Sequence, residues 1–331
     1  MVFLDLGSES RSGLMSGSLQ APGASPGLFV SSACLRRRDM ADNVGFIGLG
    51  AIGTPMAIHV ARAFPTVVWN RTQDKAARFA SRYDAEVAET PGALVGACDV
   101  IITCLPTSRE VREVIEAAGD AWRDGQLVID ASSGDPVGSR SNAEWLAQRG
   151  VGFVDAPVSG GTSGAEAGTL TTMLGGDAAW VERAKAFLPY AKRIEHVGPV
   201  GAGHALKAIN NALLALNIVA VGEGLAALVK LGVPARRAID VINASSGRSN
   251  VTENLIPERV LSRAWPRTFS AALLDKDLGV ALSVLEDTGV ASQLYPAVKR
   301  FYESARKVLD PDADHVEVIK PIEEAAGVEL T

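Results

Sequence analysis

The chain has few of the residues that build disulfide frameworks or metal sites. Its 331 residues include only three cysteines, Cys34, Cys98 and Cys104, and this odd, sparse set without paired spacing argues against disulfides and for a reducing compartment. Its four histidines lie far apart and show no metal-ligand spacing, which leaves little support for a metal-assisted mechanism. From these two shortages we expect a cytoplasmic protein with no metal site.

Neither an excess of positive charge nor a clear membrane span is present in the sequence. The formal net charge is −6 and the isoelectric point is near 5.4, so the basic face that nucleic acid requires is not expected. Residues 212–229 form the most apolar long segment, but Asn217 and Glu223 interrupt it, which predicts a buried helix rather than a membrane span. The length allows two domains with separate cores.

The first 39 residues do not carry the pattern of a folded segment. They are rich in serine, glycine and proline and show no sustained helical or strand period. A run of three arginines follows the short apolar stretch instead of preceding it, which argues against a secretory signal, and acidic residues argue against a mitochondrial presequence. We expect residues 1–39 to be a disordered leader ahead of a true start at Met40.

From residue 44 onward, short apolar runs alternate with helical patterns, which is typical of β-α-β units around a parallel sheet. The expected strands are 44–47, 66–69, 100–103, 127–130, 152–156, 171–174 and 193–196. The expected helices between them are 55–63, 73–82, 110–117, 140–148 and 178–190. This repetition predicts an α/β domain over residues 40–200, built on a Rossmann-type doubly wound and mostly parallel sheet.

The pattern changes after residue 201. Beyond it the apolar spacing is helical, and no segment has the alternation of a strand. The expected helices are 205–231, 234–244, 255–260, 273–288 and 294–308. We therefore expect an all-α domain over residues 201–331, joined to the sheet by a long helix, with a ligand cleft between the two domains.

Three glycines directly follow the first expected strand, in the spacing of a dinucleotide-binding turn. Gly48 permits the tight turn, Gly50 lets the backbone approach a pyrophosphate, and Gly53 lets the next helix pack close to the strand. The N–H groups at the start of that helix then face the phosphates. Glycine clusters also form ordinary turns, but the order strand, turn, helix favours a cofactor site. The residues expected to bind the cofactor here are Gly48, Leu49, Gly50, Ala51, Ile52 and Gly53.

The second strand ends without the carboxylate that binds the ribose hydroxyl of NAD, and Asn70, Arg71 and Thr72 stand there instead. Arg71 offers a planar guanidinium suited to a 2′-phosphate, and Lys75 follows one helical turn later. Asn70 and Thr72 can hydrogen-bond to a 2′-substituent. We therefore expect NADP(H) to be preferred, with NAD(H) as a second cofactor. The alternative for Arg71 is a solvated charge at the end of a strand.

Lys207 and Asn211 are four residues apart in an expected helix, so both side chains project from one face. Hydride transfer between nicotinamide and a carbonyl carbon leaves charge on the carbonyl oxygen. A lysine ammonium beside that oxygen can stabilise the charge and donate the proton, and the amine can accept it in the reverse direction. Asn211 would hold the substrate or the lysine in register. The alternative is a lysine whose stem packs at the start of a helix.

Ser159, Gly160 and Gly161 follow the expected strand that contains Asp155. Two adjacent glycines can turn successive N–H groups toward one point and form an anion-binding nest, to which Ser159 adds a hydroxyl. A substrate carboxylate fits such a nest, although a plain turn would use the same two glycines. Asp155 and Pro157 are expected to shape the turn rather than to react.

The glycine motif and three further segments together resemble the β-hydroxyacid dehydrogenase family, which includes 3-hydroxyisobutyrate dehydrogenase and tartronate semialdehyde (glyoxylate/succinic semialdehyde) reductases. The three segments are 155–170, 201–211 and 275–281, and the resemblance extends over residues 43–325. Four motifs in the same order and spacing are more specific than any one of them.

The resemblance implies roles for individual residues. It makes Lys207 catalytic and Asn211 its substrate-binding partner, and it assigns the substrate carboxylate to Ser159, Gly160 and Gly161.

It also implies cofactor contacts from three other segments. Leu105 and Pro106 resemble part of a loop that lines the cofactor, and Ser133 stands where the family commonly has a threonine. Lys276, with Asp277 beside it, is implied to lie near the cofactor across the cleft. The neighbouring Cys104 is expected to pack rather than to react.

The expected activity is hydride transfer between NADP(H) and a small β-hydroxy acid or its semialdehyde, with the helix lysine as general acid and base. Two alternatives stay open: an imine reductase on the same scaffold, whose members generally lack that lysine, and a non-catalytic cofactor-binding module. The expected partner is a small carboxylate, not nucleic acid or a membrane, and the apolar helical half favours a homo-dimer or homo-tetramer. Which hydroxy acid is used does not follow from these residues.

Two further side chains are candidates for the rim of the site. His204, one helical turn before Lys207, is expected to be structural or to line the rim. Arg248 lies in a loop of small residues, where its guanidinium is a candidate for contacting the far end of the substrate.

Overall fold

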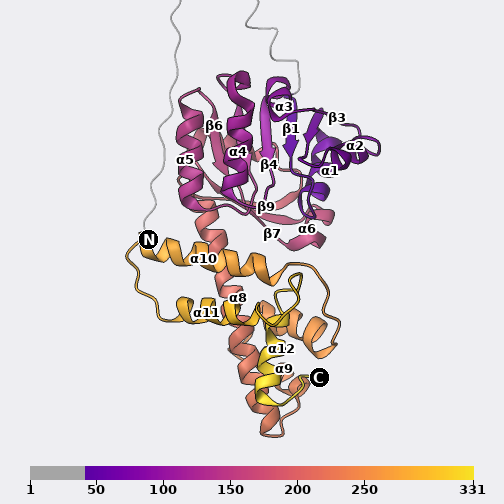
Figure 1. The fold of residues 1–331 in the computed structure, drawn as a ribbon, viewed down its shortest axis with the longest axis vertical. Coiled ribbons are helices and arrows are strands. Elements are labelled where there is room, and N and C mark those ends of the chain that lie inside the picture. Colours follow the sequence, from indigo (N-terminus) through magenta and orange to yellow (C-terminus); the bar gives the residue numbers. More distant parts are fainter. Residues whose placement is uncertain (1–41) are drawn as a thin grey trace, which may run out of the picture. The chain divides into compact units, whose positions relative to one another are not determined.

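The computed structural model describes residues 42–331, so the leader expected over residues 1–39 lies outside the described residues. Within them, a nine-stranded sheet carries helices on both faces and is followed by a helical region (Figure 1). A long helix leads from the sheet into that region. The predicted fold class, a Rossmann-type, mostly parallel sheet joined by a long helix to an all-α part, is confirmed.

The strands of the sheet are β1 Val44–Ile47, β2 Thr66–Trp69, β3 Glu86–Val87, β4 Val100–Thr103, β5 Leu127–Asp130, β6 Gly152–Asp155, β7 Val158–Ser159, β8 Leu170–Gly175 and β9 Ala191–Gly198. They lie in the order β3-β2-β1-β4-β5-β6-β8-β7, and β9 pairs with β8. All neighbours from β3 to β6 are parallel, whereas β8 is antiparallel to both β6 and β7. The chain leaves β1 toward β2 on one side and enters β4 on the other, so a ligand crevice is expected beyond the carboxyl ends of β1 and β4.

Two layers of helices cover the sheet. One layer holds α1 Gly53–Ala63, α2 Gln73–Ala80, α6 Gly161–Ala167 and α7 Ala178–Lys185; the other holds α3 Pro91–Ala97, α4 Ser108–Ala118 and α5 Pro136–Ala147. The central strands are buried on both faces: in β1, Phe46 packs into the first layer and Ile47 into the second. Continuous apolar runs in these strands follow from that double burial.

The helical region has its own apolar cluster around the long helix. Its elements are α8 Ala202–Lys230, α9 Ala235–Asn243, η2 Val251–Leu261, α10 Ala271–Asp287, α11 Leu294–Ala305, η3 Glu317–Ile319 and α12 Lys320–Ala326. Ala212, Ala215 and Ile218 of α8 are fully buried in this cluster. The segment η2 is a π-helix with Pro257 inside it; proline has no N–H to donate to a regular helical ladder.

The length and composition of α8 bear on the prediction that it is a buried helix rather than a membrane span. The sequence predicts no membrane span, yet α8 is long and apolar enough to cross a bilayer by length and composition, with a mean hydropathy of 2.1. The core helix of a globular domain passes the same test. In α8, 39% of the most apolar window is buried inside the protein, where it packs against α10, α11 and α12. Its composition alone therefore does not place it in a membrane.

Candidate active site

The turn after β1 has the backbone that a dinucleotide requires. Gly48 has a φ of +105°, a conformation that residues with a Cβ rarely adopt. A Cβ on Gly53 would lie 2.0 Å from the carbonyl oxygen of Gly48, so only glycine lets α1 pack this close. A Cβ on Gly50 would meet no protein atom within 4 Å, and α1 has no side-chain cap. At Gly48, Gly50 and Gly53 no side chain stands between the backbone N–H groups and a ligand, which fits a pyrophosphate.

The end of β2 is tied to this turn by Asn70. Its Oδ1 accepts a hydrogen bond of 2.9 Å from the N–H of Leu49, and its Nδ2 donates to the carbonyl oxygen of Thr72 at 3.0 Å. The Asn70 side chain is therefore engaged in fixing the two loops. Arg71 and Lys75 are exposed at the same edge, where their charges are available to a ligand.

The loops after β4 and β5 are bonded to each other through Ser132, the neighbour of the predicted cofactor residue Ser133. The hydroxyl of Ser132, which is buried, accepts a 2.8 Å hydrogen bond from the N–H of Leu105, and the N–H of Ser133 donates to the carbonyl oxygen of Leu105. Leu105, Ser133 and Cys104 line the cavity described next, whereas Pro106 lies beside it. Burial raises the pKa of the Cys104 thiol to about 12, so it stays protonated.

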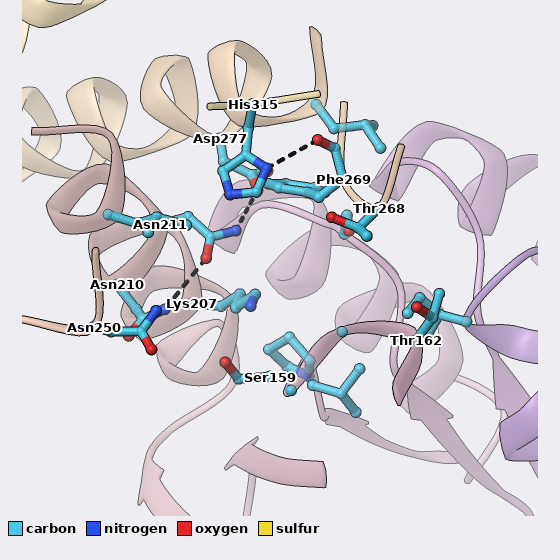
Figure 2. A pocket seen from close by; sticks show the side chains of 18 of the residues that line it. Ser159, Thr162, Lys207, Asn210, Asn211, Asn250, Thr268, Phe269, Asp277 and His315 are labelled. Atoms are coloured by element: carbon cyan, nitrogen blue, oxygen red, sulfur yellow. Dashed lines mark hydrogen bonds between the residues drawn. The ribbon is translucent and has the colours of Figure 1, made fainter. Parts of the chain in front are cut away.

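A cavity of about 770 Å³ lies at the carboxyl ends of β1 and β4. It extends along α8, between this helix and other segments of the helical region. Figure 2 shows Lys207 and Asn211 on one wall and Ser159 below them. The predicted site residues that line it are Ala51, Ile52, Leu105, Ser133, Ser159, Gly160, Gly161, Lys207 and Asn211. Thr162 and Ser163 line it too, and the sequence-based prediction missed both.

Lys207 lies in the wall of this cavity with no hydrogen bond or ion pair to any residue between 42 and 331. Burial lowers the pKa of its ammonium from the ordinary lysine value, and the carboxylate of Asp277 partly opposes that shift. A buried amine without a fixed partner is free to exchange a proton with a ligand.

A chain of polar contacts runs from α8 across α10 to the cofactor loops. The Nδ2 of Asn211 donates to Oδ2 of Asp277 at 2.6 Å, and Oδ1 of Asp277 lies 3.2 Å from Nζ of Lys276. Lys276 in turn donates to the carbonyl oxygens of Ser133 and Pro106. The sequence predicts Lys276 near the cofactor across the cleft, and the structure brings it to both of these loops.

The segment after β7 has the backbone of an anion nest. Gly160 and Gly161 have φ values of +134° and +65°, and both are exposed at the cavity. Helix α6 begins at Gly161 and carries no side-chain cap. The N–H groups of this turn are available to a carboxylate, and the hydroxyl of Ser159 lies beside them.

Asp155 and His204 fix the start of α8 and take no part in the cavity wall. Asp155 is fully buried and accepts hydrogen bonds from the N–H groups of Gly201 and His204 at 2.6 and 2.9 Å. Burial raises the pKa of Asp155, although His204 and these N–H groups oppose the shift. The ring nitrogens of His204 lie 2.6 Å from Oγ of Ser139 and 3.1 Å from the carbonyl oxygen of Ser132. His204 is thus structural. It fixes the first turn of α8, and thereby the position of Lys207 one turn later.

The interpretation of Arg248 is wrong. Its side chain is 64% exposed, lies 3.6 Å from Glu253 and does not line the cavity. The arginine that does line the cavity is Arg259, near the end of η2. The Arg248 side chain of the loop 245–249 points to solvent. Helix η2, which begins after this loop, is the element that directs side chains such as Arg259 to the cavity.

Comparison with known proteins matches both parts of the chain. Residues 43–198 match a family model described as the NAD binding domain of 6-phosphogluconate dehydrogenase. Residues 201–322 match a model described as NAD-binding of NADP-dependent 3-hydroxyisobutyrate dehydrogenase.

Individual relatives cover nearly the same span. The 2-(hydroxymethyl)glutarate dehydrogenase of Eubacterium barkeri is 35% identical over 292 residues, which are 87% of this chain and 97% of that protein. A probable 3-hydroxyisobutyrate dehydrogenase of Mycobacterium tuberculosis is 34% identical over 258 residues, 76% of this chain and 88% of that protein. The solved structure of Mycobacterium tuberculosis 3-hydroxyisobutyrate dehydrogenase with L-serine has a TM-score of 0.80 at 31% identity, covering 86% of this chain and 99% of that one.

Proposed function

Because the chain belongs to the β-hydroxyacid dehydrogenase family of NAD(P)-dependent oxidoreductases, we propose that it transfers a hydride between NADP(H) and a small β-hydroxy acid or its semialdehyde. The observation that carries the proposal is Lys207, a half-buried lysine whose amine is desolvated, in the cavity wall with the glycine turn and the nest at Gly160 and Gly161. The names of the relatives, which refer to hydroxy acids, support the same class of substrate.

The chain's own residues divide the reaction among them. When bound, the nicotinamide cofactor supplies or accepts the hydride. The N–H groups of Gly160 and Gly161 and the hydroxyl of Ser159 hold the substrate carboxylate. The Lys207 ammonium stabilises the charge that develops on the carbonyl oxygen and donates the proton that completes the alcohol. Asn211, fixed by Asp277, positions the substrate beside the lysine.

We expect the protein to reduce small semialdehydes, with a higher kcat/KM for NADPH than for NADH. Arg71 is exposed at the end of β2, where its guanidinium can pair with a 2′-phosphate, so Arg71→Ala should raise the KM for NADPH by about tenfold or more and leave that for NADH nearly unchanged. The measurement is NADPH and NADH oxidation with a panel of semialdehydes. Arg236→Ala, at an exposed position on α9, is the control.

Two outcomes of this assay would count against the proposal. Equal losses with both cofactors would show that Arg71 does not contact the phosphate. Binding of either cofactor with no turnover of any semialdehyde would favour a non-catalytic binding module.

The pH dependence should follow the ionisation of Lys207. Reduction requires the ammonium form, so kcat/KM falls as the pH rises through the pKa of Lys207, which burial holds below 10.5. Asp277→Asn removes the carboxylate that favours the ammonium, so this falling limb should move to lower pH. Alcohol oxidation requires the neutral amine, so its rising limb should move the same way. The check is the pH profile of kcat/KM in both directions; a limb that moves to higher pH in the variant contradicts the assignment.

A further inference from the structure

The end of the cavity that lies away from the sheet holds a second set of polar groups, which the proposed reaction does not use. Arg259, Thr268 and His315 line this end. They come from three segments far apart in sequence: η2, the loop before α10, and the turn before η3. Figure 2 shows Thr268 and His315 on one side of Lys207 and Ser159 on the other. The cavity therefore has polar groups at two ends, with the reactive lysine between them.

A buried carboxylate behind the wall fixes all three side chains. Asp314 is fully buried; its Oδ1 lies 3.1 Å from Nη1 of Arg259 and 2.9 Å from Nδ1 of His315. Its Oδ2 accepts from the N–H and the hydroxyl of Thr268, both at 2.9 Å, and from the N–H of Phe269 at 3.2 Å. Burial alone would raise the pKa of Asp314, but these hydrogen bonds outweigh it and hold the pKa well below its usual range. The group is thus a preorganised unit built around a permanent anion.

The unit leaves donors that face the cavity. Arg259 uses Nη1 for both of its bonds, to Asp314 and to Oγ1 of Thr268 at 2.7 Å; its Nη2 and Nε donate to no acceptor among residues 42–331. Nδ1 of His315 lies against two acceptors, Asp314 and the carbonyl oxygen of Phe269, so Nδ1 carries the proton. Nε2 of His315 then carries a lone pair and can only accept, so the donors left for an anion belong to Arg259.

The unused donors of Arg259, rather than a net excess of positive charge, favour a second anion. Its lining holds two cations, Lys207 and Arg259, and one carboxylate, Asp277. Asp277 is already bonded to Asn211 and paired with Lys276, so it faces a ligand with its charge largely offset. Asp314 offsets the charge of Arg259 in the same way, but it engages only Nη1, so Nη2 and Nε can still donate to a second carboxylate.

The cavity is also long enough for a second group. The residues of α8 that line it extend from Lys207 to Asn217, and ten residues at 1.5 Å each amount to about 15 Å along the helix axis. Apolar side chains, among them Leu214, Val251 and Leu255, form the wall over this stretch. An apolar lining of this kind suits the aliphatic spacer of a diacid.

We propose that Arg259, which Thr268 and His315 hold in place together with Asp314, binds a second carboxylate of the substrate, so that the protein acts on β-hydroxy diacids and their semialdehydes in preference to monoacids. This inference rests on the proposed function for the reacting end of the substrate. It adds a specificity determinant at the opposite end, made of a bidentate-capable guanidinium held in place by Asp314.

The test compares matched pairs of substrates in the full-length protein with NADP⁺. The diacids are the 2-(hydroxymethyl) derivatives of butanedioate, pentanedioate and hexanedioate; in each matched monoacid a methyl or a hydroxymethyl group replaces the distal carboxylate. The best diacid should exceed its monoacids in kcat/KM by at least about tenfold, the usual effect of a charge-assisted hydrogen bond. Arg259→Gln, which keeps a donor for Asp314, should abolish this preference through KM, with kcat and the monoacid values nearly unchanged.

Controls separate the subsite from folding. Arg248→Gln removes an exposed arginine outside the cavity and should leave the diacid preference intact. Arg259→Lys keeps the charge and should retain part of the preference. Thermal unfolding of each variant is measured; if Arg259→Gln does not fold, Arg259→Lys and Thr268→Val are compared instead, and both should lower the preference.

A diacid preference near one in the wild type, an equal loss on diacid and monoacid in Arg259→Gln, or a preference for the distal hydroxyl overturns the inference. If no substrate turns over, calorimetry of pentanedioate and butanoate with the NADP⁺-loaded protein decides. Binding of the diacid that depends on Arg259 keeps the subsite and removes only the proposed reaction. Equal binding of both acids, or binding of neither, overturns the subsite as well.

Discussion

Lys207→Met should lower kcat for semialdehyde reduction by about three orders of magnitude, since the variant loses both the proton donor and the charge beside the carbonyl oxygen. Methionine keeps the apolar stem, so the cavity wall changes little in volume. The Kd for NADPH, measured by fluorescence titration, should stay within about twofold of the wild type, because the glycine turn that holds the pyrophosphate is not altered. Lys192→Met, at an exposed position in β9, is the matched control and should keep full activity.

The Tm of Lys207→Met distinguishes a catalytic lysine from one that stabilises the fold. Lys207 is half-buried, and its amine is desolvated with no side-chain partner among residues 42–331, so removing its charge relieves a desolvation cost. We expect Lys207→Met to unfold at a Tm equal to or above that of the wild type. A loss of activity below about tenfold, or a Tm that falls together with activity, would show that the lysine holds the fold and not the reaction.

Two glycines of the turn after β1 should respond to alanine in opposite ways. In Gly53→Ala the new Cβ would lie 2.0 Å from the carbonyl oxygen of Gly48, so α1 must shift, at a cost of about 1–3 kcal/mol and several degrees of Tm without cofactor. In Gly50→Ala the Cβ meets no protein atom within 4 Å, so the Tm without cofactor should not change. The new methyl group would instead lie where a pyrophosphate approaches, and the Kd for NADPH should rise by at least about tenfold.

Differential scanning calorimetry and cofactor titration of both variants separate the two roles. A Gly50→Ala protein that binds NADPH as the wild type does would mean that the phosphates lie elsewhere. A Gly53→Ala protein with an unchanged Tm would mean that α1 can move away from the turn without loss of stability, contrary to the 2.0 Å approach of the new Cβ to the carbonyl oxygen of Gly48.

Sites and strands are predicted best from the sequence where all the residues that define them lie in one short segment. The glycine turn, the nest at Gly160 and Gly161, and the pair Lys207 and Asn211 each depend on local spacing, and the structure brings all of them to one cavity. The long strands were predicted for the same reason, because continuous apolar runs mark burial on both faces. Short elements such as β3, β7 and α12 were missed, since two to seven residues carry too little periodicity.

The distal end of the cavity could not be predicted in this way. Arg259, Thr268 and His315 are brought together by tertiary packing around Asp314, and nothing in their local sequence links them. Arg248 lies in the loop before η2, whereas Arg259 lies near the end of this π-helix. Arg248 was selected because it is a cation in a loop of small residues, and that loop holds no signal for which arginine lines the cavity.

The contact of Asp155 with the first turn of α8 has a consequence for the catalytic cycle. The helix is unbroken over 29 residues, and two N–H groups at its start are held by one buried side chain of the sheet. The first turn of α8 is therefore held in a fixed position against the sheet. The conformational entropy of placing the Lys207 amine beside the nucleotide site is therefore lost once, when the chain folds. It is not lost again in each catalytic turnover.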